Sequence, residues 1–146
     1  MIVKIILFLL IDIGSKIIVS RLVNINDSYV VINNFFNITY VRNTGAAWSI
    51  MAGKTDLLVI ISLIIILGLG FYLKKHKPCG NLEKYGYVLV FGGALGNFLE
   101  RLFLGYVTDF LDFNIFGYNY PIFNLADSFI FVGIVLLLID TWRYKR

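Results

Sequence analysis

Seventeen consecutive residues, from Leu57 to Leu73, carry no charge, and nearly all of them are apolar. As a helix, this segment would be about 25 Å long, which is close to the hydrocarbon thickness of a bilayer. The rest of the chain agrees, because 59% of its residues are hydrophobic and only 15% are charged. Such a chain has too little polar surface to cover a globule in water, so we expect a membrane protein.

Three further segments have the apolar character of membrane helices, although each also carries polar residues. The four expected spans are approximately 1–20, 55–73, 84–101 and 123–140, within a single domain of residues 1–146. Polar groups in the third and fourth spans must face protein or water. The opening MIVKIILFLLI resembles a secretory signal, but Asp12 and Lys16 follow it without a cleavage pattern, so we expect a retained first span.

Lysine and arginine are unevenly distributed about these spans. Eight lie at the N-terminus, in the linker 74–84 and in the C-terminal tail, and five lie elsewhere. By the positive-inside rule, both termini and this linker are cytoplasmic. The basic residues form no groove-like patch, so the formal charge of +4 does not indicate nucleic-acid binding.

The long segment 21–54, between the first two spans, would then lie on the outer side. Its stretch YVVINNFFNITYV is rich in β-branched and aromatic residues, and the pair Asn33-Asn34 is a turn signal. We therefore expect an all-α membrane protein of four transmembrane helices with a small extracytoplasmic β-sheet between the first and second spans. Residues 103–122 form a second outer connection, punctuated by Gly105 and Gly117.

The candidate chemistry depends on carboxylates. The only histidine, His76, and the only cysteine, Cys79, both lie in the cytoplasmic linker. Ser-His catalysis, Cys-His catalysis and a zinc site therefore lack their residues, and we expect neither metal nor organic cofactor. Asp109 lies in the very apolar stretch GYVTDFLDF, and Asp127 opens the fourth span. Two such acids, if they meet at a membrane surface, repel each other, share a proton and can activate a water.

Several of these residues also have a purely structural interpretation. Asn124 and Asp127 match a helix N-cap with an acid at the third helical position. Asp12 and Lys16 are spaced i,i+4, as in an ion pair that neutralises two charges near the outer end of a span. Both interpretations stay open beside the catalytic one.

The third span carries GGALGNFLERL. Gly92 and Gly96 form a GxxxG pattern that lets another helix approach closely. Gly93, Asn97 and Arg101 follow one another at i,i+4 steps, so an amide and a guanidinium share one stripe. This stripe either orients a polar backbone or headgroup, or consists of packing glycines and an interfacial arginine whose side chain extends outward.

The outer segment carries RNTGAAWS, from Arg42 to Ser49. Its run of Gly45 and two alanines would allow a ligand to approach the backbone closely, and Asn43 can both donate and accept hydrogen bonds. These residues taken alone favour the simpler interpretation, a turn that leads into a helix.

Five motifs in this order resemble the lipoprotein signal peptidase family, also called signal peptidase II: DIGSK, RNTGAAWS, GGALGNFLERL, GYVTDFLDF and FNLADS. The resemblance covers nearly the whole chain. It implies a bacterial inner-membrane aspartic endopeptidase that removes signal peptides from prolipoproteins, cutting before a diacylglyceryl-modified cysteine. The family usually has Asp where Glu100 stands, which puts the geometry of any ion pair there in question, and Phe is commoner than Trp48.

The resemblance also assigns roles to single residues. The catalytic pair falls on Asp109 and Asp127, which would hold the attacking water at the extracytoplasmic face. The expected supporting or substrate-binding residues are Asp12, Lys16, Asn43, Gly45, Asn97, Arg101 and Asn124. The glycine face of the third span and the outer segment would admit the lipidated cysteine. The expected partners are the prolipoprotein and membrane lipid, and we expect a monomer.

The alternative function is a small proton-coupled transporter with Asp12, Lys16 and Asp127 as a relay. A membrane scaffold, whose charges only cap and pair, is a third possibility. A relay needs ionisable groups at several depths. The second span has none, and the third and fourth carry theirs near their ends, so the sequence favours the peptidase.

Overall fold

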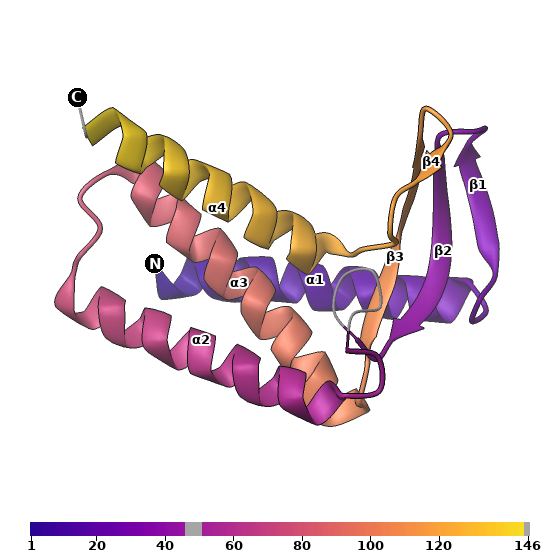
Figure 1. The fold of residues 1–146 in the computed structure, drawn as a ribbon, viewed down its shortest axis with the longest axis horizontal. Helices are drawn as coiled ribbons and strands as arrows, with labels where there is room; N and C mark the ends of the chain where they lie inside the picture. Colours follow the sequence, from indigo (N-terminus) through magenta and orange to yellow (C-terminus); the bar gives the residue numbers. More distant parts are fainter. Residues whose placement is uncertain (46–50, 145–146) are drawn as a thin grey trace.

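The structure, a computed structural model, describes residues 1–45 and 51–144. Its elements in chain order are α1 (Ile2–Leu22), β1 (Ser28–Ile32), β2 (Phe36–Asn43), α2 (Thr55–Lys75), α3 (Asn81–Leu104), β3 (Val107–Ile115), β4 (Tyr118–Asn119) and α4 (Leu125–Tyr144). Four long helices form a bundle with the sheet at one end, and the N-terminus, the α2–α3 connection and the end of α4 lie at the other end (Figure 1).

Three helices are long and apolar enough to cross a membrane: Thr55–Lys75, Asn81–Leu104 and Leu125–Arg143. They coincide with the second, third and fourth expected spans. The third was expected at about 84–101, but the helix is longer, with 24 residues, because it begins at Asn81 and ends only at the left-handed Gly105, its C-cap. α1 is also long, with 21 residues, but it carries Lys4, Asp12, Lys16 and Arg21, so length and composition do not identify it as a span.

Glycines allow the helices to approach closely. α3 packs against α1, α2 and α4. A Cβ atom on Gly92 would lie 2.9 Å from Phe8 Cβ of α1, and one on Gly86 would lie 3.0 Å from the Gly133 carbonyl oxygen of α4. The predicted GxxxG therefore serves helix packing. The expectation that the glycine face of α3 admits substrate is wrong, because α1 and α4 already occupy it.

The sheet has four antiparallel strands in the order β1-β2-β3-β4. β1 and β2 form the hairpin expected in 21–54, and its turn includes Asn34 with φ of +58°. The expected location was incomplete, because β3 and β4 come from the connection between α3 and α4. Each hairpin alone would leave an unpaired edge, so pairing β2 with β3 joins the two outer segments into one sheet.

The sheet packs on the end of α1. Val19 of α1, Tyr40 of β2 and Phe110 of β3 form a buried cluster, and Leu125 at the start of α4 packs against it. This small core holds the first residues of α4 against β3. It thereby positions the side chains at the junction of sheet and bundle.

Candidate active site

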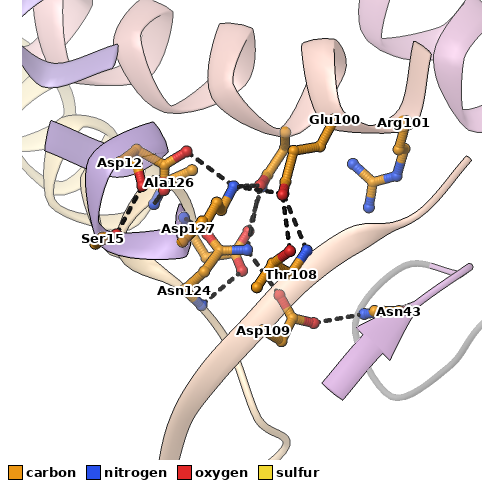
Figure 2. A network of polar contacts seen from close by, with 12 residues as sticks. Asp12, Ser15, Asn43, Glu100, Arg101, Thr108, Asp109, Asn124, Ala126 and Asp127 are labelled. Carbon is orange, nitrogen blue, oxygen red and sulfur yellow. Dashed lines mark hydrogen bonds and ion pairs between the residues drawn. The ribbon is translucent and has the colours of Figure 1, made fainter. Parts of the chain in front are cut away.

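Asp109 lies in β3, opposite Val41 of β2. Its side chain is only 3% exposed, and its two carboxylate oxygens accept hydrogen bonds from two amides. Asn43 Nδ2 donates to Oδ2 at 2.8 Å, and Asn124 Nδ2 donates to Oδ1 at 2.7 Å (Figure 2). The acid therefore has a fixed orientation in the buried first half of β3.

Asp127 occupies the third position of α4. Asn124 Oδ1 accepts the Asp127 backbone N–H at 3.0 Å, and Asp127 Oδ2 accepts the Asn124 backbone N–H at 3.3 Å. This reciprocal pair is a capping box, so the structural interpretation of the sequence is confirmed. The cap leaves Asp127 Oδ1 available for Asn97 Nδ2, which donates to it at 2.7 Å.

Two asparagines connect the acids. The residue before Asn124, Phe123, pairs with Leu111 of β3, which brings Asn124 beside Asp109. Asn124 Nδ2 also donates to Asn97 Oδ1 at 3.2 Å. Asn124 therefore contacts both carboxylates, and Asn97 contacts Asp127 and Asn124. A buried amide network of this kind sets the positions of both acids together.

Lys16 lies behind this network, 3% exposed on α1. Its Nζ lies 2.8 Å from Asp12 Oδ2 and 3.0 Å from Glu100 Oε2, and it donates to Asn97 Oδ1 at 3.0 Å. Asp12 Oδ1 accepts the backbone N–H of Ala126 at 2.9 Å (Figure 2). The predicted i,i+4 ion pair is present. It also ties α1 to the start of α4 and to α3.

Glu100 and Thr108 complete the network, and the sequence interpretation did not name them as site residues. Glu100 accepts hydrogen bonds from the Thr108 backbone N–H at 2.9 Å and from Thr108 Oγ1 at 2.8 Å. The extra methylene of glutamate therefore still permits a close ion pair with Lys16. Asn97 and Glu100 are spaced i,i+3 and therefore share one helix face, and this spacing could have indicated from the sequence that Glu100 belongs to the site.

Arg101 fixes the end of β2. Its Nη2 donates to the Gly45 carbonyl oxygen at 3.0 Å, and the Gly45 backbone N–H donates to Asn43 Oδ1 at 2.8 Å. Arg101 Nε is buried without a hydrogen-bond partner among the described residues. Ala46, Ala47, Trp48 and Ser49 of the RNTGAAWS motif lie outside the described residues.

A cavity of about 610 Å³ opens beside the two acids; we call it the front cavity. Its polar lining includes Asn43, Asn97, Arg101, Asp109, Asp127 and Ser128, and its apolar lining includes Phe113, Ile122, Phe131 and Val132. Phe131 is 69% exposed on the outer surface of α4, so the cavity reaches the apolar surface of the bundle. An amphiphile with a reacting polar group and an apolar tail fits such a lining.

The structure brings all nine predicted site residues into one connected network. Asp109, Asp127, Asn43, Asn97 and Arg101 line the front cavity, whereas Asp12, Lys16, Gly45 and Asn124 support them from behind. Asp112, three residues beyond Asp109, is not part of it: Thr39 Oγ1 donates to Asp112 Oδ2 at 2.7 Å within the sheet.

The environment of Asp109 favours a shared proton. Burial raises the pKa of Asp109 to about 7, the hydrogen bond from Asn43 opposes this rise, and the neighbouring charge of Asp127 adds to it. At neutral pH, the two acids can therefore hold one proton between them. That is the state in which one carboxyl accepts a proton while the other donates one.

An apolar cavity with two adjacent carboxyl groups, beside helices of membrane length, defines a membrane protein equipped for aspartic-type hydrolysis. The family model of signal peptidase (SPase) II matches residues 4–143. The chain is 46% identical over 131 residues to the lipoprotein signal peptidase of Staphylococcus haemolyticus (strain JCSC1435), covering 90% of this chain and 83% of that protein. It is 44% identical over 125 residues to the lipoprotein signal peptidase of Staphylococcus aureus (strain JH9), covering 86% and 77%.

Two solved structures described as bacterial membrane enzymes have the same fold. One, at 2.3 Å resolution, superimposes with a TM-score of 0.90 at 40% identity, covering 99% of this chain and 88% of the other. The second, at 1.9 Å resolution, gives a TM-score of 0.85 at 41% identity, covering 96% and 90%. The chain belongs to the signal peptidase II family.

Proposed function

We propose that Asp109 and Asp127 are the catalytic pair with which this protein, an aspartic-type lipoprotein signal peptidase, removes the signal peptide from its substrates. The observation that carries the proposal is the joint position of the two acids. Both line one cavity, and Asn124 forms hydrogen bonds with both. Asp109→Asn or Asp127→Asn would keep the shape of either side chain but remove its acid-base function.

The proposed substrate is a prolipoprotein with a diacylglyceryl-modified cysteine. Its acyl chains would stay in the bilayer and along the apolar lining of the front cavity. Its scissile peptide bond would then lie at the depth of the two acids, so the lipid supplies both affinity and position. Arg101, whose Nε has no hydrogen-bond partner among the described residues, would orient a carbonyl oxygen of the bound peptide.

The proposed reaction uses one shared proton. A water held between Asp109 and Asp127 attacks the carbonyl carbon before the modified cysteine, one acid accepts the proton from that water, and the other donates its proton to the carbonyl oxygen. The resulting tetrahedral diol breaks its carbon–nitrogen bond as the leaving amine takes up the proton of one acid, while a diol hydroxyl gives its proton to the other acid and the new carboxyl group forms. The pair returns to its singly protonated state, with one water consumed.

The proposed topology places all four helices across a bacterial cytoplasmic membrane, with α1 as the first span in addition to α2, α3 and α4. Asp12 and Lys16 are buried and paired, which lowers the cost of carrying these charges into the bilayer. The N-terminus, the α2–α3 connection and the end of α4 lie at one end of the bundle (Figure 1). With that end cytoplasmic, the sheet and the two acids lie at the extracytoplasmic face. We expect the protein to act as a monomer.

The test is cleavage of a diacylglyceryl-modified prolipoprotein by the purified full chain, followed by gel shift. Wild type should cut it, whereas Asp109→Asn and Asp127→Asn should each reduce the rate by at least about a hundredfold. Asp112→Asn is the matched control, since Asp112 lies on the same strand but outside the front cavity. Near wild-type cleavage by a folded Asp109 or Asp127 variant would reject the pair.

The transporter alternative is not supported. The chain belongs to a peptidase family, and Asp12 and Lys16 are occupied in a fixed ion pair that joins three helices.

A further inference from the structure

A second cavity, which we call the rear cavity, lies on the other face of the β2–β3 pair. In the register of the two strands, Arg42 lies opposite Thr108 and Asn43 lies opposite Val107. Side chains alternate between the faces of a sheet. Asn43 and Val107 therefore line the front cavity, and Arg42 and Thr108 line the rear one.

The rear cavity has a volume of about 460 Å³ and lies between α1, α3 and the sheet. Its helix walls include the apolar residues Ile13 and Ile17 of α1 and Phe103 and Leu104 of α3, together with the polar Ser20, Lys16 and Glu100. Ile17 is 46% exposed and Phe103 is 76% exposed, so these walls continue onto the outer surface of the bundle. These exposed apolar side chains suit an apolar chain that enters from the side.

The sheet end of the rear cavity is cationic. Arg42 Nε donates to the Tyr40 hydroxyl at 3.0 Å, and the guanidinium lies 4.7 Å from the centre of the Tyr106 ring. These two contacts orient the guanidinium, yet Arg42 forms no ion pair with any described residue. At the floor of the cavity, Lys16 and Glu100 neutralise each other at 3.0 Å. Arg42 is thus an oriented positive charge available to an anion.

We propose that the rear cavity binds an anionic phospholipid, with its phosphate on Arg42 and an acyl chain between α1 and α3. A guanidinium offers a phosphate two parallel N–H donors, and apolar walls beside it match the adjoining acyl chain. The uncharged diacylglyceryl group of a lipoprotein precursor has no partner for Arg42. The rear cavity therefore selects a membrane lipid, whereas the front cavity takes the substrate.

The lipid would act on the catalytic site through the strands that separate the cavities. Arg42 lies opposite Thr108 in the two strands. The residue after Thr108 is Asp109, and the residue after Arg42 is Asn43, which donates a hydrogen bond to Asp109. An occupant of the rear cavity restricts motion of this pair of strands. We expect phospholipid to raise the cleavage rate a few-fold, an effect that rests on the proposed function, whereas binding itself rests only on the membrane position of α1.

The binding test uses the purified full chain in neutral detergent and native mass spectrometry, with phosphatidylglycerol, phosphatidylcholine and diacylglycerol offered separately. We expect wild type to retain phosphatidylglycerol in preference to the other two. Arg42→Gln should weaken this retention about tenfold, because a charge-assisted contact is lost. Arg21→Gln, which removes an exposed arginine of α1 that does not line the cavity, is the matched control. Ile17→Trp, which fills the cavity from its apolar side, should also abolish retention.

The site would be overturned if wild type and a folded Arg42→Gln variant retained phosphatidylglycerol equally, or if wild type retained diacylglycerol as well as phosphatidylglycerol. Displacement of the lipid by millimolar inorganic phosphate would also overturn it, because that result would indicate a site for a free anion. The cleavage assay separates the two proposals. Selective lipid retention by a wild-type protein that cuts no prolipoprotein would support the rear site while overturning the proposed function. A cleavage rate that does not change when phosphatidylglycerol is bound would overturn the coupling between the rear cavity and the catalytic site.

Discussion

Asn124, the residue that caps α4, donates a 2.7 Å hydrogen bond from its side chain to Asp109. The same side chain accepts the Asp127 backbone N–H at 3.0 Å. One residue therefore ends the connection from the sheet, begins a membrane-length helix and sets the geometry of both acids. The cap and the candidate active site are the same structure, so substitutions here affect stability and activity together.

Asn124→Ala should destabilise the protein by about 1 kcal/mol through loss of the cap and should also reduce cleavage. Asn124→Ser retains a capping oxygen but cannot reach both acids, so it should recover stability without recovering activity. Thermal unfolding and the gel-shift assay together distinguish the two effects. Recovery of both properties in Asn124→Ser would contradict the positioning role.

The cleavage rate should decrease as pH rises through about 7. The pKa of Asp109 is raised to about 7, so this acid is protonated below that pH and ionised above it, and the reaction needs one shared proton. Folding stability should change in the same direction, since an acid with a raised pKa favours the folded state at low pH and loses that contribution between about 4 and 7. A pH–rate profile flat from 6 to 9 would exclude this state of the pair.

Lys16→Met should be strongly destabilising, by about 3–5 kcal/mol, because it leaves the carboxylates of Asp12 and Glu100 buried without their cation. Lys4→Met is the control. Lys4 is exposed and contacts only the Tyr85 side chain among the described residues, so its loss should cost no more than about 1 kcal/mol. Denaturant or thermal unfolding in detergent measures both. Similar stability of the two variants would show that the Lys16 cluster is not a structural centre.

Gly96→Ala should displace Asp12. A Cβ atom at Gly96 would lie too close to Asp12 Oδ2. The Asp12 carboxylate cannot easily move away, because it pairs with Lys16 and accepts a hydrogen bond from the Ala126 backbone N–H of α4. We expect a loss of about 1–3 kcal/mol from this overpacking and a lower cleavage rate. Gly14→Ala on α1 has open space around it, so it should be neutral or stabilising by up to about 1 kcal/mol. An unchanged unfolding temperature for Gly96→Ala would refute the close contact.

The membrane helices and their approximate ends followed from the sequence, because an uncharged run such as Leu57 to Leu73 has one stable solution in lipid. Local signals were equally reliable: the turn at Asn34, the left-handed Gly105 and the cap at Asn124 each depend on neighbouring residues only. The Asp12–Lys16 pair belongs to the same class, since one helical turn brings the two side chains together.

The arrangement of the sheet and the assembly of the site depended on tertiary structure. Val107 of β3 lies opposite Asn43 of β2 although it comes 64 positions later in the chain, and no local pattern encodes such a pairing. Glu100 illustrates the consequence: it reads as a charge near a helix end, and only the folded chain brings it to both Lys16 and Thr108. The sequence by itself determined which residues could perform acid-base chemistry. Long-range packing of α1, α3, β3 and α4 decided which of them meet.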